Sequence, residues 1–312
     1  MGTVKSPLVS RILVVLPSLN EGVTISALVT EATEACSSIN AELEFLVADD
    51  SQGSDQALNE LAAQDSRVRL FIPTSRLGHQ RGLTAALRSV REELPEFDAI
   101  VTMDADGEDR PQDIPRLVQP VLTQSVDLAR AKRGKRDVHQ SFNLGYLTYR
   151  ALFRTLTGMK ITSGNFAAAR GSWWHAEIQS NIWNLTFSGT LASITGRVVD
   201  IPCDRDARRE GKSRMNFSAL IGYGLMFALP FSLKIAVRAA VVTAVASVLA
   251  VVMILTVVAL RLFTETSTPG WTTTVAFGAA GVVLIAFVAL TSALVLYAST
   301  NAARADSGRI TD

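Results

Sequence analysis

Two long apolar segments near the carboxyl end constrain this chain more than any other feature. Ala239–Leu260 is a run of 22 residues without a charge, bounded by Arg238 and Arg261. A second uncharged segment covers Thr266–Ala303, with its most apolar part at Val275–Tyr297. Because a membrane span needs about 20 apolar residues, we predict two transmembrane helices, at about 239–260 and 275–297. The alternative is a pair of buried helices in a soluble core, but neither segment has the polar face of such a helix.

The stretch before the first span is ambiguous. Met215–Leu233 is uncharged, but Gly222, Gly224 and Pro230 interrupt it. We predict one or two amphipathic helices lying in the membrane interface. A third span is the alternative, and it would invert the topology. The predicted organisation is a catalytic domain over 1–214, juxtamembrane helices over 215–238, and a two-helix membrane region with a short tail over 239–312.

Basic residues around the two spans predict the orientation in the membrane. Lys234 and Arg238 precede the first span, and Arg304 and Arg309 follow the second. The positive-inside rule therefore places both termini in the cytoplasm, although Arg261 opposes this. No apolar signal-peptide core precedes Arg11, so the first 238 residues are expected to stay cytoplasmic. The predicted location is the inner (cytoplasmic) membrane.

Outside the apolar segments the composition is that of a soluble domain. The chain has 30 Lys and Arg and 29 Asp and Glu, with a formal net charge of +1. Most of these charges lie within residues 1–238, and no long basic run is present, so nucleic acid is not an expected partner. Two cysteines, Cys36 and Cys203, are too few for a disulfide framework or a cysteine zinc site, which favours a reducing compartment.

Apolar runs alternate with helical patterns in the first 140 residues. The patterns predict strands at 12–16, 43–48, 68–72 and 99–103, and helices at about 21–37, 55–63 and 78–93. This alternation is typical of an α/β domain with a mostly parallel sheet covered by helices. Ligands of such sheets bind at the carboxyl ends of the strands.

Polar residues follow three of the predicted strands. Asn20 follows the first strand and is placed to cap the next helix. Asp49 and Asp50 follow the second strand in a turn that Asp55 is expected to end as a helix cap. The fourth strand ends in a D-x-D motif, formed by the carboxylates of Asp104 and Asp106. Two such carboxylates suit a hard divalent cation that also holds a diphosphate.

The three histidines are scattered along the chain. His79, His139 and His175 are expected to be structural or exposed rather than metal ligands.

Four segments in this order resemble glycosyltransferase family 2, which has the GT-A fold. They are LVVLPSLNE, ADDSQGSD, SRLGHQRGLTAAL and TMDADGED. Within that family the chain is most similar to the polyprenyl-phosphate glycosyltransferases, over about residues 10–235, and two following spans fit their bacterial members. The Q-x-x-R-W signature of processive polysaccharide synthases is absent.

The resemblance implies a role for each matching residue. A nucleotide-sugar donor is expected to bind near Pro17, Asn20, Glu21, Asp49, Asp50, Arg76, Gly78, His79, Gln80 and Asp104. Asp104 and Asp106 are expected to hold Mg²⁺ or Mn²⁺. A basic loop with Arg133 and Arg136 is expected near the phosphates. A late R-x-x-G-x-S-K/R pattern, formed by Arg208, Gly211, Ser213 and Arg214, is expected close to the membrane and the lipid phosphate. The alternative for both basic stretches is a solvated or lipid-facing surface.

One departure from the family pattern concerns catalysis. The related enzymes often have Gly-Asp-Phe after the middle helix, and that aspartate is a candidate base. Here the stretch is Gly164-Asn165-Phe166, and asparagine cannot accept a proton. Asp106, Asn165, Arg133 and Arg214 are the expected catalytic residues.

The leading hypothesis is an inverting, metal-dependent transfer of one sugar from a nucleotide-sugar to a polyprenyl (undecaprenyl-type) phosphate at the cytoplasmic face. A catalytically silent, membrane-anchored nucleotide-sugar binder is one alternative. A glycosyltransferase acting on another lipid, such as a diacylglycerol or a sphingoid base, is another. The sequence leaves open the sugar, the nucleotide and whether the chain forms a homo-oligomer.

Overall fold

The computed structural model describes residues 9–133, 153–155, 157–158, 163–209, 217–263 and 270–305. These residues divide into two compact units. The first contains the described residues up to 133, those from 163 to 227, and residues 304 and 305. The second contains the described residues of 153–158 and those from 228 to 303.

The first unit is built on a mixed sheet whose strands have the order β3-β2-β1-β4-β6-β5-β7. The strands are β1 (Ser10–Ser18), β2 (Ala41–Asp49), β3 (Val68–Phe71), β4 (Ala99–Thr102), β5 (Leu128–Arg133), β6 (Ser163–Ala169) and β7 (Val198–Cys203). The pairs β1–β2, β1–β4, β2–β3 and β5–β7 are parallel, and β6 runs antiparallel to β4 and β5. The expected α/β class with a mostly parallel sheet is confirmed.

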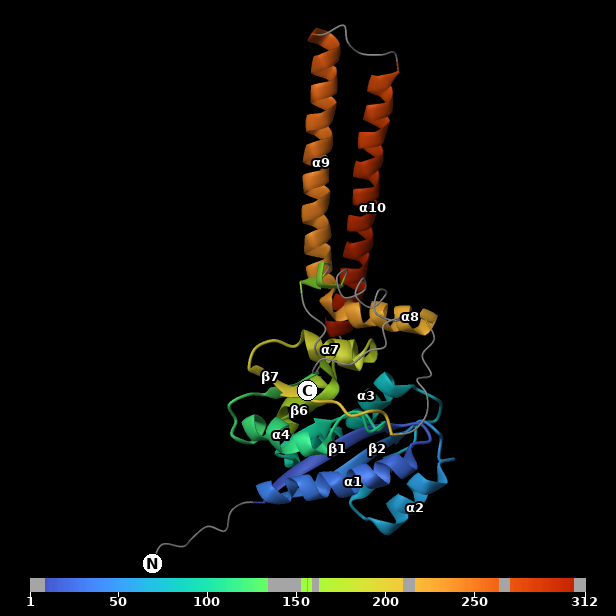
Figure 1. The fold of residues 1–312 in the computed structure, drawn as a ribbon, viewed down its shortest axis with the longest axis vertical. Coiled ribbons are helices and arrows are strands. Elements are labelled where there is room, and N and C mark those ends of the chain that lie inside the picture. The colour runs from blue at the N-terminus through green and yellow to red at the C-terminus, as the bar shows by residue number, and fades with distance from the viewer. Residues whose placement is uncertain are drawn as a thin grey trace, which may run out of the picture. The chain divides into compact units, whose positions relative to one another are not determined.

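Helices cover both faces of this sheet (Figure 1). They are α1 (Gly22–Cys36), α2 (Gln56–Gln64), α3 (His79–Ser89), α4 (Ile114–Leu122), α6 (Gly171–Glu177) and α7 (Phe187–Ser193). Successive side chains of a strand point to opposite faces, so Val14 packs with α1 and α4 while Val15 packs with α3 and α7. Burial on both faces explains why β1 is a continuous apolar run rather than an alternating one.

The predicted strands and helices of the first 103 residues are all present, with bounds that differ by a few residues. One local expectation is wrong: Asn20 does not cap α1. Its φ is +60°, and the capping position belongs to Glu21, whose side chain makes no capping hydrogen bond. The free N–H of Gly22 instead donates to Oδ2 of Asp55 over 2.9 Å. Asp55 also caps α2 by accepting from the N–H of Leu58, as predicted.

The later part of the chain is helical. The short helix α8 (Phe217–Ala228) is followed by a 3₁₀ turn, η6 (Leu229–Phe231), and then by the long helices α9 (Ser232–Phe263) and α10 (Trp271–Ala305). Two helical stretches, Gly224–Phe263 and Thr273–Ser299, are long and apolar enough to cross a membrane. They contain the two predicted spans. The predicted interfacial position of 215–233 stays a prediction.

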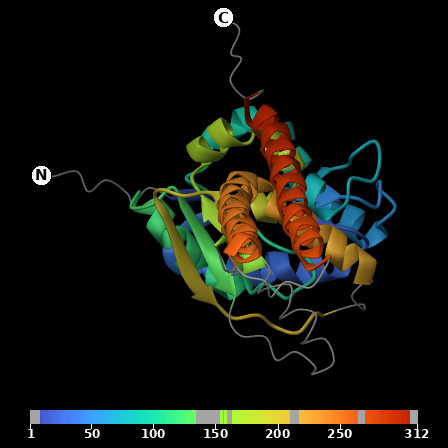
Figure 2. The same ribbon diagram turned by 90° about the horizontal axis from the view of Figure 1, so that it is seen from above.

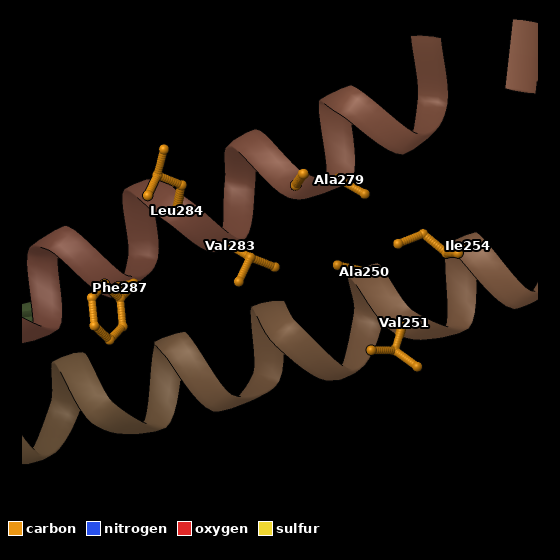
Figure 3. A pocket seen from close by; sticks show the side chains of 8 residues that line it. Ala250, Val251, Ile254, Ala279, Val283, Leu284 and Phe287 are labelled. Atoms are coloured by element: carbon orange, nitrogen blue, oxygen red, sulfur yellow. The ribbon is translucent and has the colours of Figure 1, made fainter. Parts of the chain in front are cut away.

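Within the second unit, α9 and α10 lie side by side (Figure 2). The Oγ1 of Thr243 donates to the carbonyl oxygen of Ala286 over 2.9 Å, which joins the two helices. A cavity of about 390 Å³ lies between them (Figure 3). Its lining is apolar and consists of Ala250, Val251, Ile254, Ala279, Ala280, Val283, Leu284 and Phe287.

Candidate active site

Polar side chains from five segments meet at the carboxyl ends of β1 and β4. They are Glu21, His79, Gln80, Asp104, Asp106, Asn165 and Arg208. β1 and β4 are parallel neighbours, so the residues after both strands reach the same edge of the sheet. β6 runs the opposite way beside β4, which brings its early residue Asn165 to that edge. This is the edge at which ligands of open α/β sheets bind.

Asp104 is held by groups on both sides. Its Oδ1 lies 2.7 Å from Nε2 of His79 and accepts a hydrogen bond of 2.8 Å from Nδ2 of Asn165. Its backbone N–H donates to the carboxylate of Asp109. Of the two side chains, His79 is the more exposed, at 44% against 12% for Asp104. His79 is exposed, as expected, but it also contacts the first carboxylate of the D-x-D motif.

The amide of Asn165 has a defined orientation. The backbone N–H of Ser188 can only donate, and it lies 2.8 Å from Oε1 of Gln80. Nε2 of Gln80 therefore faces Oδ1 of Asn165, at 3.1 Å. That leaves Nδ2 of Asn165 to donate to Asp104. Asn165 is 3% exposed and acts as a neutral donor toward the carboxylate.

Asp106 lies in a tight turn next to a cationic group. Its Oδ1 accepts from the backbone N–H of Glu108, and its Oδ2 lies 3.7 Å from Nη2 of Arg208. The same Nη2 lies 3.3 Å from Oε1 of Glu21. Burial raises the pKa of Glu21, and the nearby Asp106 raises it too, while His79 and Arg208 oppose this. Arg208 and His79 therefore both offset the negative charge at this edge.

The segment after β7 lies against the D-x-D loop. Nη2 of Arg205 lies 2.8 Å from Oε2 of Glu108 and its backbone bridges to Asp109. The backbone N–H of Arg209 donates to the carbonyl oxygen of Asp106. These contacts hold residues 204–209, the 204–209 segment, against the loop. The segment supplies Arg208 to the site.

Other predicted donor-site residues form the surrounding loops. Both oxygens of the buried Asp49 carboxylate accept backbone N–H groups of its own turn, from Ser51 and Gly53. The carboxylate of Asp50 accepts from the N–H groups of Leu77 and Gly78, which fixes the loop before α3. Pro17 is a buried residue of β1, whereas Asn20 and Arg76 are exposed. Asp49 and Asp50 therefore fix the loops that surround the Asp104 and Asp106 carboxylates.

Several predicted basic residues fall outside the part described. The backbone of Arg133 ends β5, paired with Cys203. Arg136, Gly211, Ser213 and Arg214 lie outside the described residues. Sequence reasoning also missed three residues that contact or support the site, namely Ser188, Arg205 and Arg209. The three arginines among residues 205–209 were a signal for two of them, but nothing local indicated the backbone of Ser188.

The donor atoms at this edge fit a hard divalent cation that shares its coordination with a ligand. Mg²⁺ is commonly held by one or two carboxylates, several waters and substrate phosphates. Asp104 and Asp106 supply two such carboxylates. Among the residues that the structure describes, no group of three or more His, Cys, Asp or Glu is arranged to hold a metal without further ligands. The site therefore matches a shared cation site rather than a self-contained one.

The family model for glycosyl transferase family 2 matches residues 13–174, just over half of the chain. The chain belongs to glycosyl transferase family 2. The match contains Glu21, Gln80, the D-x-D motif and Asn165, whereas Arg208 lies beyond it. The expected enzyme class, a glycosyltransferase, is confirmed at the level of this family.

Solved structures similar to this family member include a mannosyl-3-phosphoglycerate synthase and a glucosyl-3-phosphoglycerate synthase. Mannosyl-3-phosphoglycerate synthase from Rubrobacter xylanophilus matches with a TM-score of 0.49 and 16% identity, over 72% of this chain and 74% of that one. Glucosyl-3-phosphoglycerate synthase from Mycobacterium tuberculosis, in complex with uridine diphosphate, matches with a TM-score of 0.48 and 19% identity, over 72% and 80%. The latter enzyme in complex with Mn²⁺ and UDP-glucose matches with a TM-score of 0.46 and 19% identity, over 73% and 79%.

Proposed function

We propose that this chain transfers a single sugar from a nucleotide-sugar to a polyprenyl (undecaprenyl-type) phosphate at the cytoplasmic face of the membrane, with inversion at the anomeric carbon. The observation that supports this most is the meeting of Glu21, Asp104, Asp106 and Arg208 at one sheet edge. It occurs in a family 2 chain that also has two helices long enough to span a bilayer. A lipid acceptor that stays in the membrane explains why one chain has both features.

On this proposal the donor diphosphate lies over the D-x-D loop. Asp104 and Asp106 would hold Mg²⁺ or Mn²⁺, which supplies positive charge to the leaving nucleoside diphosphate. Arg208, already placed beside Asp106, contributes a second positive charge to the same leaving group. Pro17, Asn20, Glu21, Asp49, Asp50, Arg76 and Gln80 are the proposed donor-binding residues.

The acceptor side needs a cationic pocket near the membrane. Arg133, Arg136, Ser213 and Arg214 are proposed to bind the lipid phosphate, and Arg208 is proposed to lie between that phosphate and the donor diphosphate. Juxtamembrane helices over 215–238 would bring the catalytic domain, residues 1–214, to the bilayer surface. Both termini would then be cytoplasmic, with spans at about 239–260 and 275–297.

The chemistry does not require a protein base. A phosphate oxygen of the acceptor bonds to the anomeric carbon while the bond from that carbon to the diphosphate breaks, and the electron pair leaves with the nucleoside diphosphate. A phosphate monoester is largely dianionic at neutral pH because its second pKa is about 6. Its oxygen is already nucleophilic, so an asparagine at position 165 is compatible with turnover. Asn165 can orient Asp104 or the sugar by hydrogen bonds.

The purified full chain should be incubated with labelled nucleotide-sugars and one of three acceptors: undecaprenyl phosphate, a diacylglycerol or a sphingoid base. We expect one labelled product, formed only with undecaprenyl phosphate. The rate should rise as the acceptor phosphate ionises and then stay flat to about pH 9. A product formed with an alcohol acceptor would favour the other-lipid alternative.

Asn165 also motivates the silent-binder alternative, because a candidate base is absent there. A wild type that binds nucleotide-sugars but transfers none of them, and that gains activity as Asn165→Asp, would replace the proposal with that alternative.

A further inference from the structure

The 204–209 segment is attached to the D-x-D loop at both of its ends. At one end, Arg205 pairs with Glu108 at 2.8 Å, and the N–H of Asp206 donates to the carbonyl oxygen of Glu108 over 3.0 Å. At the other end, the N–H of Arg209 donates to the carbonyl oxygen of Asp106 over 3.2 Å. Arg208 lies between these attachments, so its position follows from theirs.

The side chain of Arg209 crosses the D-x-D loop over Gly107. A Cβ atom added at position 107 would lie 2.6 Å from Cγ and 2.7 Å from Cδ of Arg209. Gly107 also has a φ of +79°, a conformation that glycine adopts readily. The glycine in this motif therefore satisfies two requirements, a tight turn and a passage for the Arg209 stem.

Beyond Gly107 the guanidinium of Arg209 reaches α1. Its Nη1 and Nη2 lie 2.6 Å and 2.7 Å from the two carboxylate oxygens of Glu31. This is a two-point pair, which fixes direction as well as distance. Pairing with Arg209 lowers the pKa of Glu31. Glu21, which contacts Arg208, lies directly before α1. The Arg209–Glu31 pair therefore joins the 204–209 segment to the same helix that Glu21 precedes.

We propose that Arg209 is a positioning residue: by pairing with Glu31 across Gly107, it holds the 204–209 segment over the D-x-D loop and so directs Arg208 at the donor diphosphate. This inference rests on the proposed function for the role of Arg208. The contacts of Arg208 itself are longer, at 3.3 Å to Glu21 and 3.7 Å to Asp106, and 31% of its side chain is exposed. The direction of the Arg208 side chain consequently depends on the backbone that Arg209 holds in place. A small displacement of a charged group in an active site lowers the reaction rate.

The test uses Glu31→Ala, Arg209→Ala and the double variant in the full chain. Glu34→Ala is the matched control, because Glu34 is an exposed glutamate of the same helix with no side-chain pair recorded in the described residues. Hydrogen exchange of the amides in residues 204–209 reports the attachment. The KM for the nucleotide-sugar, read against kcat, reports the aim of Arg208.

We expect faster exchange in residues 204–209 and a kcat lowered by about fivefold or more in both single variants, with KM changed less, because Arg208 acts on the charge of the leaving group. The double variant should be no worse than the worse single one, because both changes remove the same pair. The melting temperature should change little, since the pair is partly exposed.

Unchanged exchange in residues 204–209 would show that the pair does not hold the segment, and the proposal would fall. Faster exchange with an unchanged kcat would show that the pair holds the segment without positioning Arg208, and would equally overturn the proposal. An inactive wild type would refute the proposed function and with it the aim of Arg208. The exchange data would then still decide whether Glu31 and Arg209 hold the segment.

Discussion

The guanidinium of Arg208 lies 3.3 Å from the carboxylate of Glu21, although 187 residues separate them in the chain. Burial raises the pKa of Glu21 and the nearby Asp106 raises it further, whereas His79 and Arg208 lower it. A bound diphosphate would compete for the same guanidinium. On the proposed function, Arg208 therefore couples donor binding to the acidic edge of the sheet.

Replacing Arg208 should harm the reaction more than the fold. We expect Arg208→Gln to lower kcat/KM by about a hundredfold or more, since charge on the leaving group is the main demand of such a transfer. Arg67→Gln is the control, because Arg67 forms an ion pair with Asp65 away from the site. Steady-state kinetics of the full chain measure both. Equal losses in the two variants would contradict the role of Arg208.

Removing the second carboxylate of the D-x-D motif tests the cation. Asp106→Ala should abolish turnover while the melting temperature and membrane insertion are retained, and EDTA should do the same to the wild type. Asp65→Ala serves as the control carboxylate. Full activity in EDTA, or in the Asp106 variant, would remove the metal from the mechanism.

A negative charge introduced next to Asp104 should be harmful. Asn165→Asp places a second carboxylate where the donor Nδ2 now lies, 2.8 Å from Oδ1 of Asp104, and two like charges at that distance do not both ionise easily. Gln80→Glu should have a similar effect. The glutamate would face Asn165 with an acceptor oxygen in place of Nε2, so the Asn165 amide would rotate and turn its own oxygen toward Asp104. We expect kcat to fall by up to about tenfold in each case. Gln64→Glu, on the exposed end of α2, is the control. Gains in kcat would argue against this account.

The predicted topology can be tested with reporter fusions. A reporter fused after Gly270 should give the external signal, and one fused after Asp312 the cytoplasmic signal, because two spans lie between the catalytic domain and the carboxyl end. Alkaline phosphatase and a fluorescent protein that folds only in the cytoplasm are suitable reporters. Reversed signals at the two positions would mean that residues 215–233 also span the membrane or that the first predicted span does not insert. Matching signals would mean that the second predicted span does not insert.

The two cysteines should resist alkylation in the folded chain. Both are buried and free, and burial raises the pKa of Cys36 to about 11 and that of Cys203 to about 12. At pH 8 only about one Cys36 thiol in a thousand is ionised. Iodoacetamide should label them in denaturant and spare them in the native protein, as mass spectrometry would show. Rapid native labelling of either would mean that its surroundings open.

The raised pKa of the two thiols predicts that the protein becomes less stable as the pH rises above 9. Their pKa in the unfolded chain returns to the ordinary value of 9.0, so unfolding releases protons above that pH. Their contribution to the free energy of unfolding is complete below pH 9 and declines as the pH rises toward 11. Thermal melts of Cys36→Ala and wild type at pH 7 and pH 10 measure it. A larger loss in the variant than in the wild type would contradict the assignment.

Much of this protein follows from the sequence by itself. The spans are predicted by length and hydropathy, and the first four strands by apolar runs that alternate with helical patterns. The D-x-D pair falls at a sheet edge because it directly follows a strand. These features depend on residues near one another in the chain, where periodicity and composition are sufficient.

The partners of those carboxylates were decided only by the tertiary structure. Asn165 reaches Asp104 across 61 residues because β6 runs antiparallel beside β4, an order that no local pattern specifies. The cap expected from Asn20 is absent because Asp55, 33 residues later, binds the N–H of Gly22 instead. Arg208 and Arg209 reach the D-x-D loop for the same reason: a pairing between distant segments depends on the order in which strands join the sheet, and side chains compete for each donor only after that order is fixed.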